Sequence, residues 1–232
     1  MQIKKAMILA AGYGKRMLPL TETIPKPLIN IGQKNFLERS IELLIKIGVT
    51  EIVLNVYYLS HKIEKFIEKK NYHASIKLVK EEKLLDTGGG ILNATKQFND
   101  EPFFVLNPDT VWSKNYFEEF KVLENFYFTK KKPVLLLVDK KKSYDKSFKG
   151  DFNFTNHQII TREKNNNYIF TGVQIINRSI FNEMKEKVFS MNLIWDQLIQ
   201  KKILLAQESN QFFFHINNLG VFKELEKLKF ID

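Results

Sequence analysis

The chain has 232 residues, of which 44% are hydrophobic and 27% are charged, a balance typical of a globular protein and not of a disordered one. It contains no cysteine, which excludes disulfides, thiolate metal sites and cysteine nucleophiles. The formal net charge of +10 suits anionic partners such as nucleotides and sugar phosphates.

The amino-terminal apolar run is too short for a signal peptide, because Gly12, Lys15 and Arg16 interrupt it. No apolar stretch approaches the ~20 residues that a transmembrane helix needs. We therefore expect a cytoplasmic protein without a membrane partner.

The first half of the chain alternates strand and helix patterns. Short apolar runs predict strands, and apolar residues at helical spacing predict helices between them. The strands are expected at residues 6–9, 51–55, 76–79 and 103–106, and the helices at residues 35–47, 60–69 and 91–98. Helices between strands imply parallel pairing in a doubly wound α/β sheet, with ligands at the carboxyl ends of the strands.

The second half has a mixed pattern with a predicted hairpin. Alternating residues around Asn156 and His157 predict this hairpin, with arms at residues 150–155 and 158–162. Strands are expected at residues 133–138, 168–176, 203–206 and 212–216, and helices at residues 179–189, 193–201 and 220–230. No repeat or linker is visible, so one mixed α/β domain is predicted.

The strongest functional signal directly follows the first strand. Small residues let backbone amides approach a ligand closely, Lys15 and Arg16 add positive charge, and two prolines hold Lys26 on a stiff segment. This arrangement predicts a nucleoside triphosphate site. Its predicted contacts are Leu9, Ala10, Ala11, Gly12, Tyr13, Gly14, Lys15, Arg16 and Lys26. The dinucleotide fingerprint is excluded because Met17 stands where its third glycine is required, and the P-loop pattern is absent.

Residues 12–21 read Gly-x-Gly-x-Arg-Met-x-Pro-Leu-Thr, and residues 25–28 read Pro-Lys-Pro-Leu. This segment closely resembles the sugar-1-phosphate nucleotidylyltransferase family, and the resemblance extends over nearly the whole chain. It implies a Rossmann-like, GT-A-like nucleotide-diphospho-sugar transferase fold in one domain. Residues 1–130 would then bind the nucleotide and residues 131–232 the sugar.

Within this family the chain is most similar to N-acetylmuramate 1-phosphate uridylyltransferases and mannose-1-phosphate guanylyltransferases. The resemblance therefore implies UTP or GTP as one substrate and a sugar 1-phosphate as the other. N-acetylmuramate 1-phosphate with UTP is the first expectation, and mannose or heptose 1-phosphate with GTP is the alternative.

Two further segments carry expectations about the nucleotide and a metal. Three glycines at residues 88–90 are expected to open a helix and bring bare backbone to a ligand, and the resemblance places Gly88 at the nucleobase. The resemblance also implies that Asp109 binds Mg²⁺ and that Asn107 contacts the sugar phosphate. A carboxylate at the end of a strand suits this hard cation, although Pro108 departs from the family pattern.

The resemblance implies further contacts to the sugar phosphate in the second half of the chain. Asp151 follows Gly150 in a Gly-Asp-Phe segment, Lys164 belongs to a Glu-Lys pair, and residues 171–172 match a strand that lines the sugar pocket. The expected sugar-phosphate residues are therefore Asn107, Asp151, Lys164, Thr171 and Gly172.

The second metal ligand departs from the family pattern, in which many members have an aspartate. Here either His215 or Asn218 takes that position, depending on the register, and His215 is preferred. Neither supplies a carboxylate, and imidazole suits softer metals better than Mg²⁺. His215 could instead donate a hydrogen bond to phosphate or pack in the interior.

The implied reaction joins a sugar 1-phosphate to a nucleoside triphosphate and releases pyrophosphate, with Arg16, Lys26 and Asp109 as its catalytic residues. The missing second carboxylate leaves an inactive nucleotide-binding homologue as an alternative. A nucleic-acid partner is not expected, because the lysine clusters at residues 130–132 and 140–142 lack interleaved aromatic residues.

Overall fold

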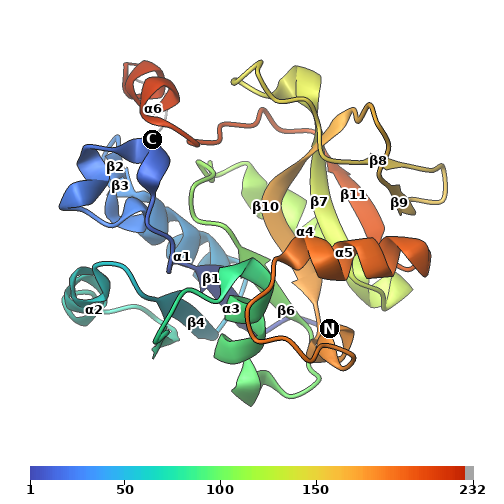
Figure 1. Cartoon of the computed structure of the whole chain (residues 1–232), viewed down its shortest axis with the longest axis horizontal. Coiled ribbons are helices and arrows are strands. Elements are labelled where there is room, and N and C mark those ends of the chain that lie inside the picture. Colours follow the sequence, from blue (N-terminus) through green and yellow to red (C-terminus); the bar gives the residue numbers. More distant parts are fainter. Residues whose placement is uncertain (228–232) are drawn as a thin grey trace.

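The computed structural model describes residues 1–227, and a seven-stranded mixed sheet forms its centre (Figure 1). The strand order is β11-β7-β10-β6-β1-β4-β5. The bounds are β1 (Lys5–Leu9), β4 (Glu51–Val56), β5 (Ser75–Lys80), β6 (Phe103–Leu106), β7 (Val134–Asp139), β10 (Tyr168–Ile176) and β11 (Leu205–Ser209). Strands β6, β1, β4 and β5 pair in parallel, as do β7 and β11, whereas β10 runs antiparallel to both of its neighbours. The prediction of a doubly wound mixed α/β sheet is confirmed.

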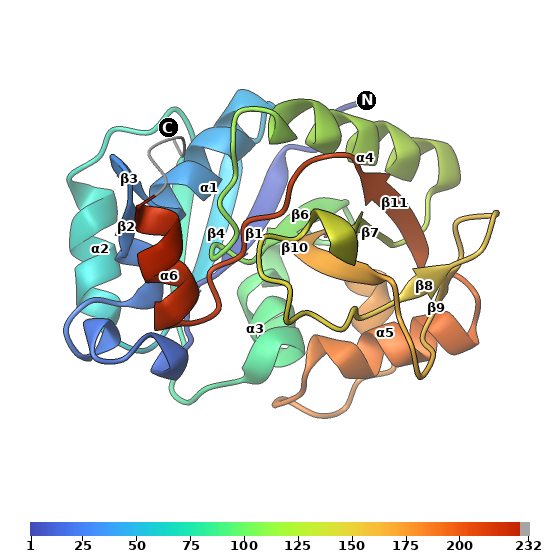
Figure 2. The same ribbon diagram turned by 90° about the horizontal axis from the view of Figure 1, so that it is seen from above.

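Helices cover both faces of this sheet (Figure 2). Their bounds are α1 (Phe36–Lys46), α2 (Ser60–Glu68), α3 (Asp86–Ala94), α4 (Tyr116–Lys130), α5 (Met191–Gln200) and α6 (Leu219–Glu226). Helices α1, α2 and α4 pack on one face, and α3 and α5 pack on the other. The central strands read as continuous apolar runs because both of their faces are buried. None of the described helices is long and apolar enough to cross a membrane.

Two short hairpins complete the described part of the chain. One pairs β2 (Asn30–Ile31) with β3 (Lys34–Asn35), and the other pairs β8 (Asn153–Phe154) with β9 (Ile160–Thr161). The second is the predicted hairpin, with shorter arms than expected. Residues 212–216 contribute single bridges to Ser143 and Thr110 and do not form a strand. The last predicted helix corresponds to α6, and its expected residues 228–230 lie outside the described residues.

Helix α4 was not predicted from the sequence, because its apolar residues do not keep to one side. Phe117 is partly buried against the core, and the ammonium groups of Lys46 and Lys121 lie 4.7 and 4.2 Å from its ring centroid. These long side chains shield the ring by cation–π contact. The helical periodicity is obscured because Val122 is exposed, whereas Glu119 and Glu124 on the same helix are buried.

The helix predicted at residues 179–189 is wrong. Only a 3₁₀ turn, Arg178–Phe181, forms there, and residues 187–189 instead run along α3. Gly89 N donates to Phe189 O at 3.0 Å, and Phe189 N donates to Leu85 O at 3.2 Å. The backbone groups of this segment are thus satisfied by the amino-terminal end of α3 instead of by a helix of their own.

The parallel strands place three loops at one edge of the sheet. Strands β1, β4 and β6 end at Leu9, Val56 and Leu106, and the loop after each strand begins at that edge. The antiparallel β10 starts at the same edge, because Val173 pairs with Leu106 and residues 168–172 extend beyond it. This edge is where ligands bind in open α/β sheets.

Candidate active site

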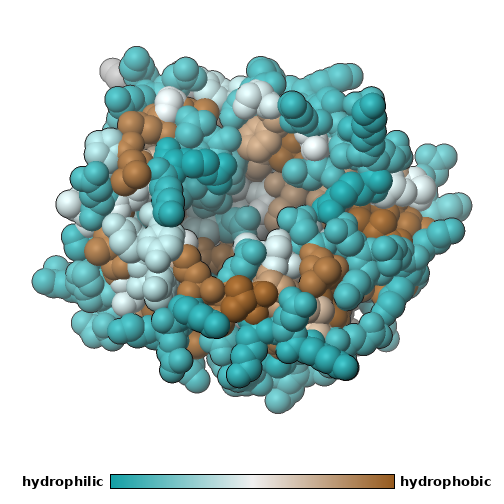
Figure 3. Space-filling view, in the orientation of Figure 1, coloured by the Kyte–Doolittle hydropathy of each residue, from teal (hydrophilic) through white to brown (hydrophobic). Residues whose placement is uncertain are grey.

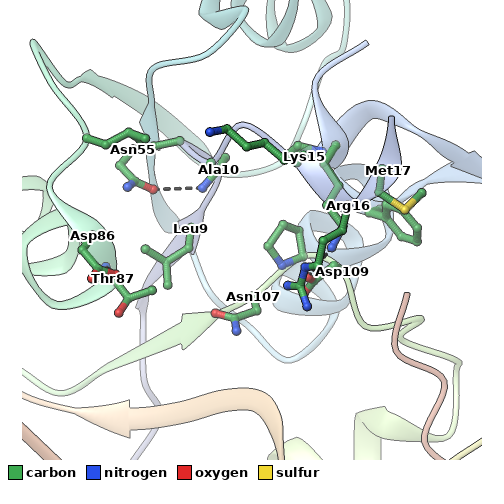
Figure 4. Close-up of a pocket in the computed structure, with 18 of the residues that line it drawn as sticks. Leu9, Ala10, Lys15, Arg16, Met17, Asn55, Asp86, Thr87, Asn107 and Asp109 are labelled. Carbon is green, nitrogen blue, oxygen red and sulfur yellow. Dashed lines mark hydrogen bonds and ion pairs between the residues drawn. The ribbon is translucent and has the colours of Figure 1, made fainter. Parts of the chain in front are cut away.

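A cavity of about 560 Å³ opens at the carboxyl ends of β1, β4 and β6, where the surface is hollowed near the centre of the face (Figure 3). Most of the predicted nucleotide-binding residues line it. Those that do are Leu9, Ala10, Ala11, Gly12, Gly14, Lys15, Arg16 and Lys26, together with Asn107 and Asp109. In Figure 4, Lys15, Arg16 and Asp109 lie on one side of the cavity, and Asp86 and Thr87 lie on the opposite side.

The cationic side of the cavity is shaped by a turn at Gly14. This residue has φ +65°, and a Cβ atom there would lie 2.9 Å from Cγ2 of Thr21 and 3.1 Å from Cβ of Lys26. The hydroxyl of Thr21 also donates to the Gly14 carbonyl at 3.0 Å. Glycine therefore permits both the left-handed backbone and the close approach of the Lys26 segment.

Tyr13 lies outside the set of residues that line the cavity. Its ring packs against Tyr57 and Tyr58, with centroid distances of 5.9 and 5.3 Å. The Lys15 ammonium lies 5.4 Å from the centroid of the Tyr13 ring. Tyr13 therefore contacts Lys15, which lines the cavity, but does not line the cavity itself.

Lys26 and Asp109 form an ion pair inside the cavity. Lys26 Nζ donates to Asp109 Oδ2 at 2.6 Å, and the two side chains are 15% and 19% exposed. Burial by itself would raise the pKa of Asp109, but the charges of His215 and Lys26 and the Lys26 hydrogen bond lower it to about 2. Burial also lowers the pKa of His215, whereas Lys26 is the cation in direct hydrogen-bond contact with Asp109.

His215 lies beside Asp109, and Asn218 does not share this position. The Nδ1 atom of His215 is 3.7 Å from Asp109 Oδ1 and 3.4 Å from Thr110 Oγ1. The Asn218 side chain instead caps α6 by accepting from Val221 N at 3.0 Å. Of the two alternatives from the sequence, His215 is therefore the one next to the carboxylate.

The residues present fit a divalent cation that is held mainly by its substrates. Asp109 Oδ1 is buried and has no hydrogen-bond partner, so it is available as a hard oxygen ligand. Within residues 1–227, no three histidine, aspartate or glutamate side chains gather closely enough to hold a metal by themselves. Mg²⁺ commonly uses one or two carboxylates together with waters and substrate phosphates. One carboxylate with the His215 imidazole beside it matches that pattern.

The opposite side of the cavity is braced by two buried polar residues that the sequence analysis missed. Asn55 Oδ1 accepts from Ala10 N at 2.9 Å, and Asn55 Nδ2 donates to Glu81 Oε1 at 2.7 Å (Figure 4). Glu81 is 3% exposed, lines the cavity, and accepts from Leu85 N at 3.1 Å. A polar residue at the end of an apolar strand was the available signal for Asn55. Nothing in the sequence distinguishes Glu81 from the exposed Glu82 beside it.

Gly88, which was predicted to contact the nucleobase, does not line the cavity but packs against Phe189. A Cβ atom on Gly88 would lie 2.4 Å from the Phe189 ring, and one on Gly89 would lie 2.3 Å from Lys187 O. Because these two glycines have no side chain, the segment at residues 187–189 can pack closely against them. Both glycines lie inside α3, which starts at Asp86 and not at residue 91 as predicted. Asp86 and Thr87, in the first turn of α3, line the cavity instead.

These distances give a matched pair of predictions. Gly89→Ala is expected to destabilise the protein by about 1–3 kcal/mol, because its methyl group meets a backbone carbonyl. Gly12→Ala is the control, since nothing lies within 4 Å of a Cβ atom there, and it should leave the free energy of unfolding nearly unchanged. Urea denaturation of both variants provides the measurement. Equal unfolding free energies would contradict the packing role of Gly89.

The predicted sugar-phosphate residues of the second half surround the start of β10. Asp151 Oδ2 accepts from Phe170 N at 2.9 Å, and burial raises the pKa of Asp151. Gly172 has φ +97°, and its carbonyl accepts from Asn107 N at 2.8 Å. Thr171 is buried, and its hydroxyl donates to Leu136 O. Lys164 is exposed in the loop between β9 and β10.

Comparison with known proteins gives a family and a fold. Residues 5–188 match the nucleotidyl transferase family. The chain is 40% identical to mannose-1-phosphate guanyltransferase beta-B of Xenopus laevis over 111 residues, or 46% of this chain. That match spans 31% of the relative, about a third of its length.

Two solved structures resemble the chain along nearly its whole length. HddC from Yersinia pseudotuberculosis, complexed with GMP-PN, has a TM-score of 0.77 at 24% identity and covers 97% of this chain and 99% of its own. A UDP-glucose pyrophosphorylase complexed with UDP-glucose has a TM-score of 0.81 at 17% identity and covers 98% of both chains. At these identities the likeness establishes a shared fold.

Proposed function

Because the chain belongs to the nucleotidyl transferase family, we propose that it joins a sugar 1-phosphate to the α-phosphorus of a nucleoside triphosphate and releases pyrophosphate. The observation that carries this proposal is the cavity at the strand ends, which brings Lys15, Arg16 and Lys26 together with Asp109. HddC complexed with GMP-PN and a UDP-glucose pyrophosphorylase complexed with UDP-glucose share this fold, which supports nucleotide binding. We assign nucleotide binding to residues 1–130 and sugar binding mainly to residues 131–232.

The chemistry requires little from a general base. A phosphate oxygen of the sugar 1-phosphate attacks the α-phosphorus, the bond from this phosphorus to its bridging oxygen breaks, and pyrophosphate leaves. The second pKa of a phosphate monoester is about 6, so the nucleophile is already mostly ionised at neutral pH. Correct orientation of the two substrates supplies much of the rate.

The main obstacle is electrostatic, because one anion must approach another. Arg16 and Lys26 line the cavity beside Asp109, where they can neutralise charge that develops on the phosphate oxygens. We assign Lys15 to the departing pyrophosphate. A bound divalent cation such as Mg²⁺ would be held by Asp109 and by substrate phosphates, and would add further positive charge there.

Glu81 favours guanine as the nucleobase. Its carboxylate lines the cavity and already accepts from Asn55 Nδ2 and Leu85 N, and its remaining lone pairs can accept further hydrogen bonds from a base. Guanine presents two adjacent donors, N1–H and N2–H, on its Watson–Crick edge, whereas uracil presents one N–H between two carbonyl oxygens that a carboxylate repels. Together with the Xenopus relative's name, this chemistry supports GTP with mannose 1-phosphate.

A second candidate is N-acetylmuramate 1-phosphate with UTP. The Gly150-Asp151-Phe152 segment favours it, since this segment resembles the uridylyltransferase-like members of the family. Asp151 lies at the start of β10, within electrostatic reach of His215, and could accept hydrogen bonds from sugar hydroxyls. A heptose 1-phosphate with GTP is the remaining alternative.

Pyrophosphate release tests the proposal and separates these candidates. Purified protein with Mg²⁺ is mixed with each of the four nucleoside triphosphates, each combined with mannose, heptose or N-acetylmuramate 1-phosphate. We expect the highest kcat/KM for GTP with mannose 1-phosphate. The highest value with UTP and N-acetylmuramate 1-phosphate would select the second candidate. Nucleotide binding without release in any combination would identify an inactive homologue.

The role of Glu81 gives a sharper prediction. Glu81→Gln should lower kcat/KM for GTP relative to UTP by about 10- to 100-fold, because guanine would lose a hydrogen bond to a charged carboxylate. Glu82→Gln removes the same charge from the exposed neighbour and is the control. An unchanged ratio in Glu81→Gln would exclude Glu81 as the residue that selects the base.

A further inference from the structure

The free protein already places one cation against Asp109. Lys26 Nζ is 2.6 Å from Asp109 Oδ2, and both side chains are largely removed from solvent. The other carboxylate oxygen, Oδ1, is buried without a hydrogen-bond partner, and the imidazole Nδ1 of His215 lies 3.7 Å from it. The carboxylate is therefore half occupied, by an ammonium group on one oxygen only.

A divalent ion and an ammonium group compete for such a site. Both are cations, and their mutual repulsion at short range is strong because the Lys26 and Asp109 side chains are largely removed from solvent. Arg16 lines the same cavity and adds further positive charge to it. A metal that reaches Asp109 must therefore displace the Lys26 ammonium or bind weakly beside it.

The side chain of Lys26 can make this exchange although its backbone is held. Pro25 and Pro27 flank the residue, a 3₁₀ turn covers Lys26–Leu28, and Gly14 packs against its Cβ position. The lysine stem has four flexible carbons, so its ammonium can leave the carboxylate while the backbone stays in place. Phosphate oxygens of a nucleotide in the cavity would offer the ammonium a new partner.

We propose that Lys26 occupies the cation position of Asp109 in the nucleotide-free protein and competes there with a divalent ion, so that the metal enters together with the triphosphate. The inference rests on the proposed role of Asp109 as a metal ligand, but its test does not use the transferase reaction. It makes the same lysine an inhibitor of metal binding in the free protein and an aid to catalysis once the nucleotide is bound.

The test is direct Mn²⁺ binding to the nucleotide-free protein, with free Mn²⁺ measured by electron paramagnetic resonance. Lys26→Met should bind Mn²⁺ at least about tenfold more tightly than the wild type, because a competing charge is removed. Lys15→Met is the matched control: it removes a lysine from the same cavity whose ammonium lies over Tyr13 and not on Asp109. We expect its affinity to change less than about threefold.

Two further variants complete the design. Lys26→Met combined with Asp109→Asn should lose the gain, and Lys26→Gln should reproduce it if the methionine variant folds poorly. Mn²⁺ affinity in Lys26→Met and Lys26→Gln equal to or below that of the wild type would overturn the inference, as would an equal gain in Lys15→Met. Absence of pyrophosphate release from the wild type would instead count against the proposed function, so the two failures are distinct.

Discussion

Replacement of Lys26 by alanine is expected to lower kcat by about 10²-fold or more. The ammonium lies in the cavity beside the carboxylate that we assign to the metal, where negative charge from two phosphates must be brought together. Such charge is greatest in the transition state, so kcat should fall more than the KM for the nucleotide rises. Steady-state kinetics at saturating sugar 1-phosphate provide the measurement.

Lys34→Ala is the control for this experiment. Lys34 also forms a lysine–carboxylate pair, with Glu42 at 2.6 Å, but both partners are over 40% exposed. It should keep nearly full activity, because exposed ion pairs contribute little. If Lys26→Ala retained the wild-type kcat, the lysine would have no part in the transition state.

The second large effect is expected from Asp109→Asn, which should lower Mg²⁺-dependent turnover by about 10²- to 10³-fold. The amide keeps the shape of the side chain but removes the charge that would hold a divalent ion, and it leaves the Lys26 ammonium without its anion. Turnover should be measured as a function of Mg²⁺ concentration, and folding should be verified by circular dichroism.

Asp100→Asn is a suitable comparison, because Asp100 accepts from Ser179 N, and neither residue lines the cavity. Loss of activity should be confined to Asp109→Asn. Full activity of that variant at low Mg²⁺ would show that the carboxylate at position 109 does not serve the reaction.

Local signals explain which parts of the fold could be predicted. The buried strands of the first half are mainly apolar runs, so their bounds could be predicted from the sequence to within one or two residues. The family could also be recognised from the sequence, because its glycine, arginine and proline motif lies within one short segment, residues 12–28. Lys26 and Asp109 were expected in one site at the carboxyl ends of the strands, but the ion pair between them was not predicted.

Long-range packing explains what the sequence could not reveal. The small size of Gly88 and Gly89 serves a segment 100 residues away in the chain, around Phe189, and no local pattern encodes this contact. The same contact gives residues 187–189 their backbone partners in place of the predicted helix. Glu81 and Asn55 become neighbours only when β4 and β5 pair, so their role in bracing the cavity depends on the tertiary structure.

The central position of β10 has a consequence for synthesis on the ribosome. Strand β6 is fully buried and lies between β1 and β10, but β10 follows it in the chain only after α4, β7 and the second hairpin. At about 5–20 residues per second, the emerging chain presents the apolar, unpaired edge of β6 for several seconds before its partner exists. During translation, the strand that carries the carboxylate loop is thus open to pairing with wrong partners.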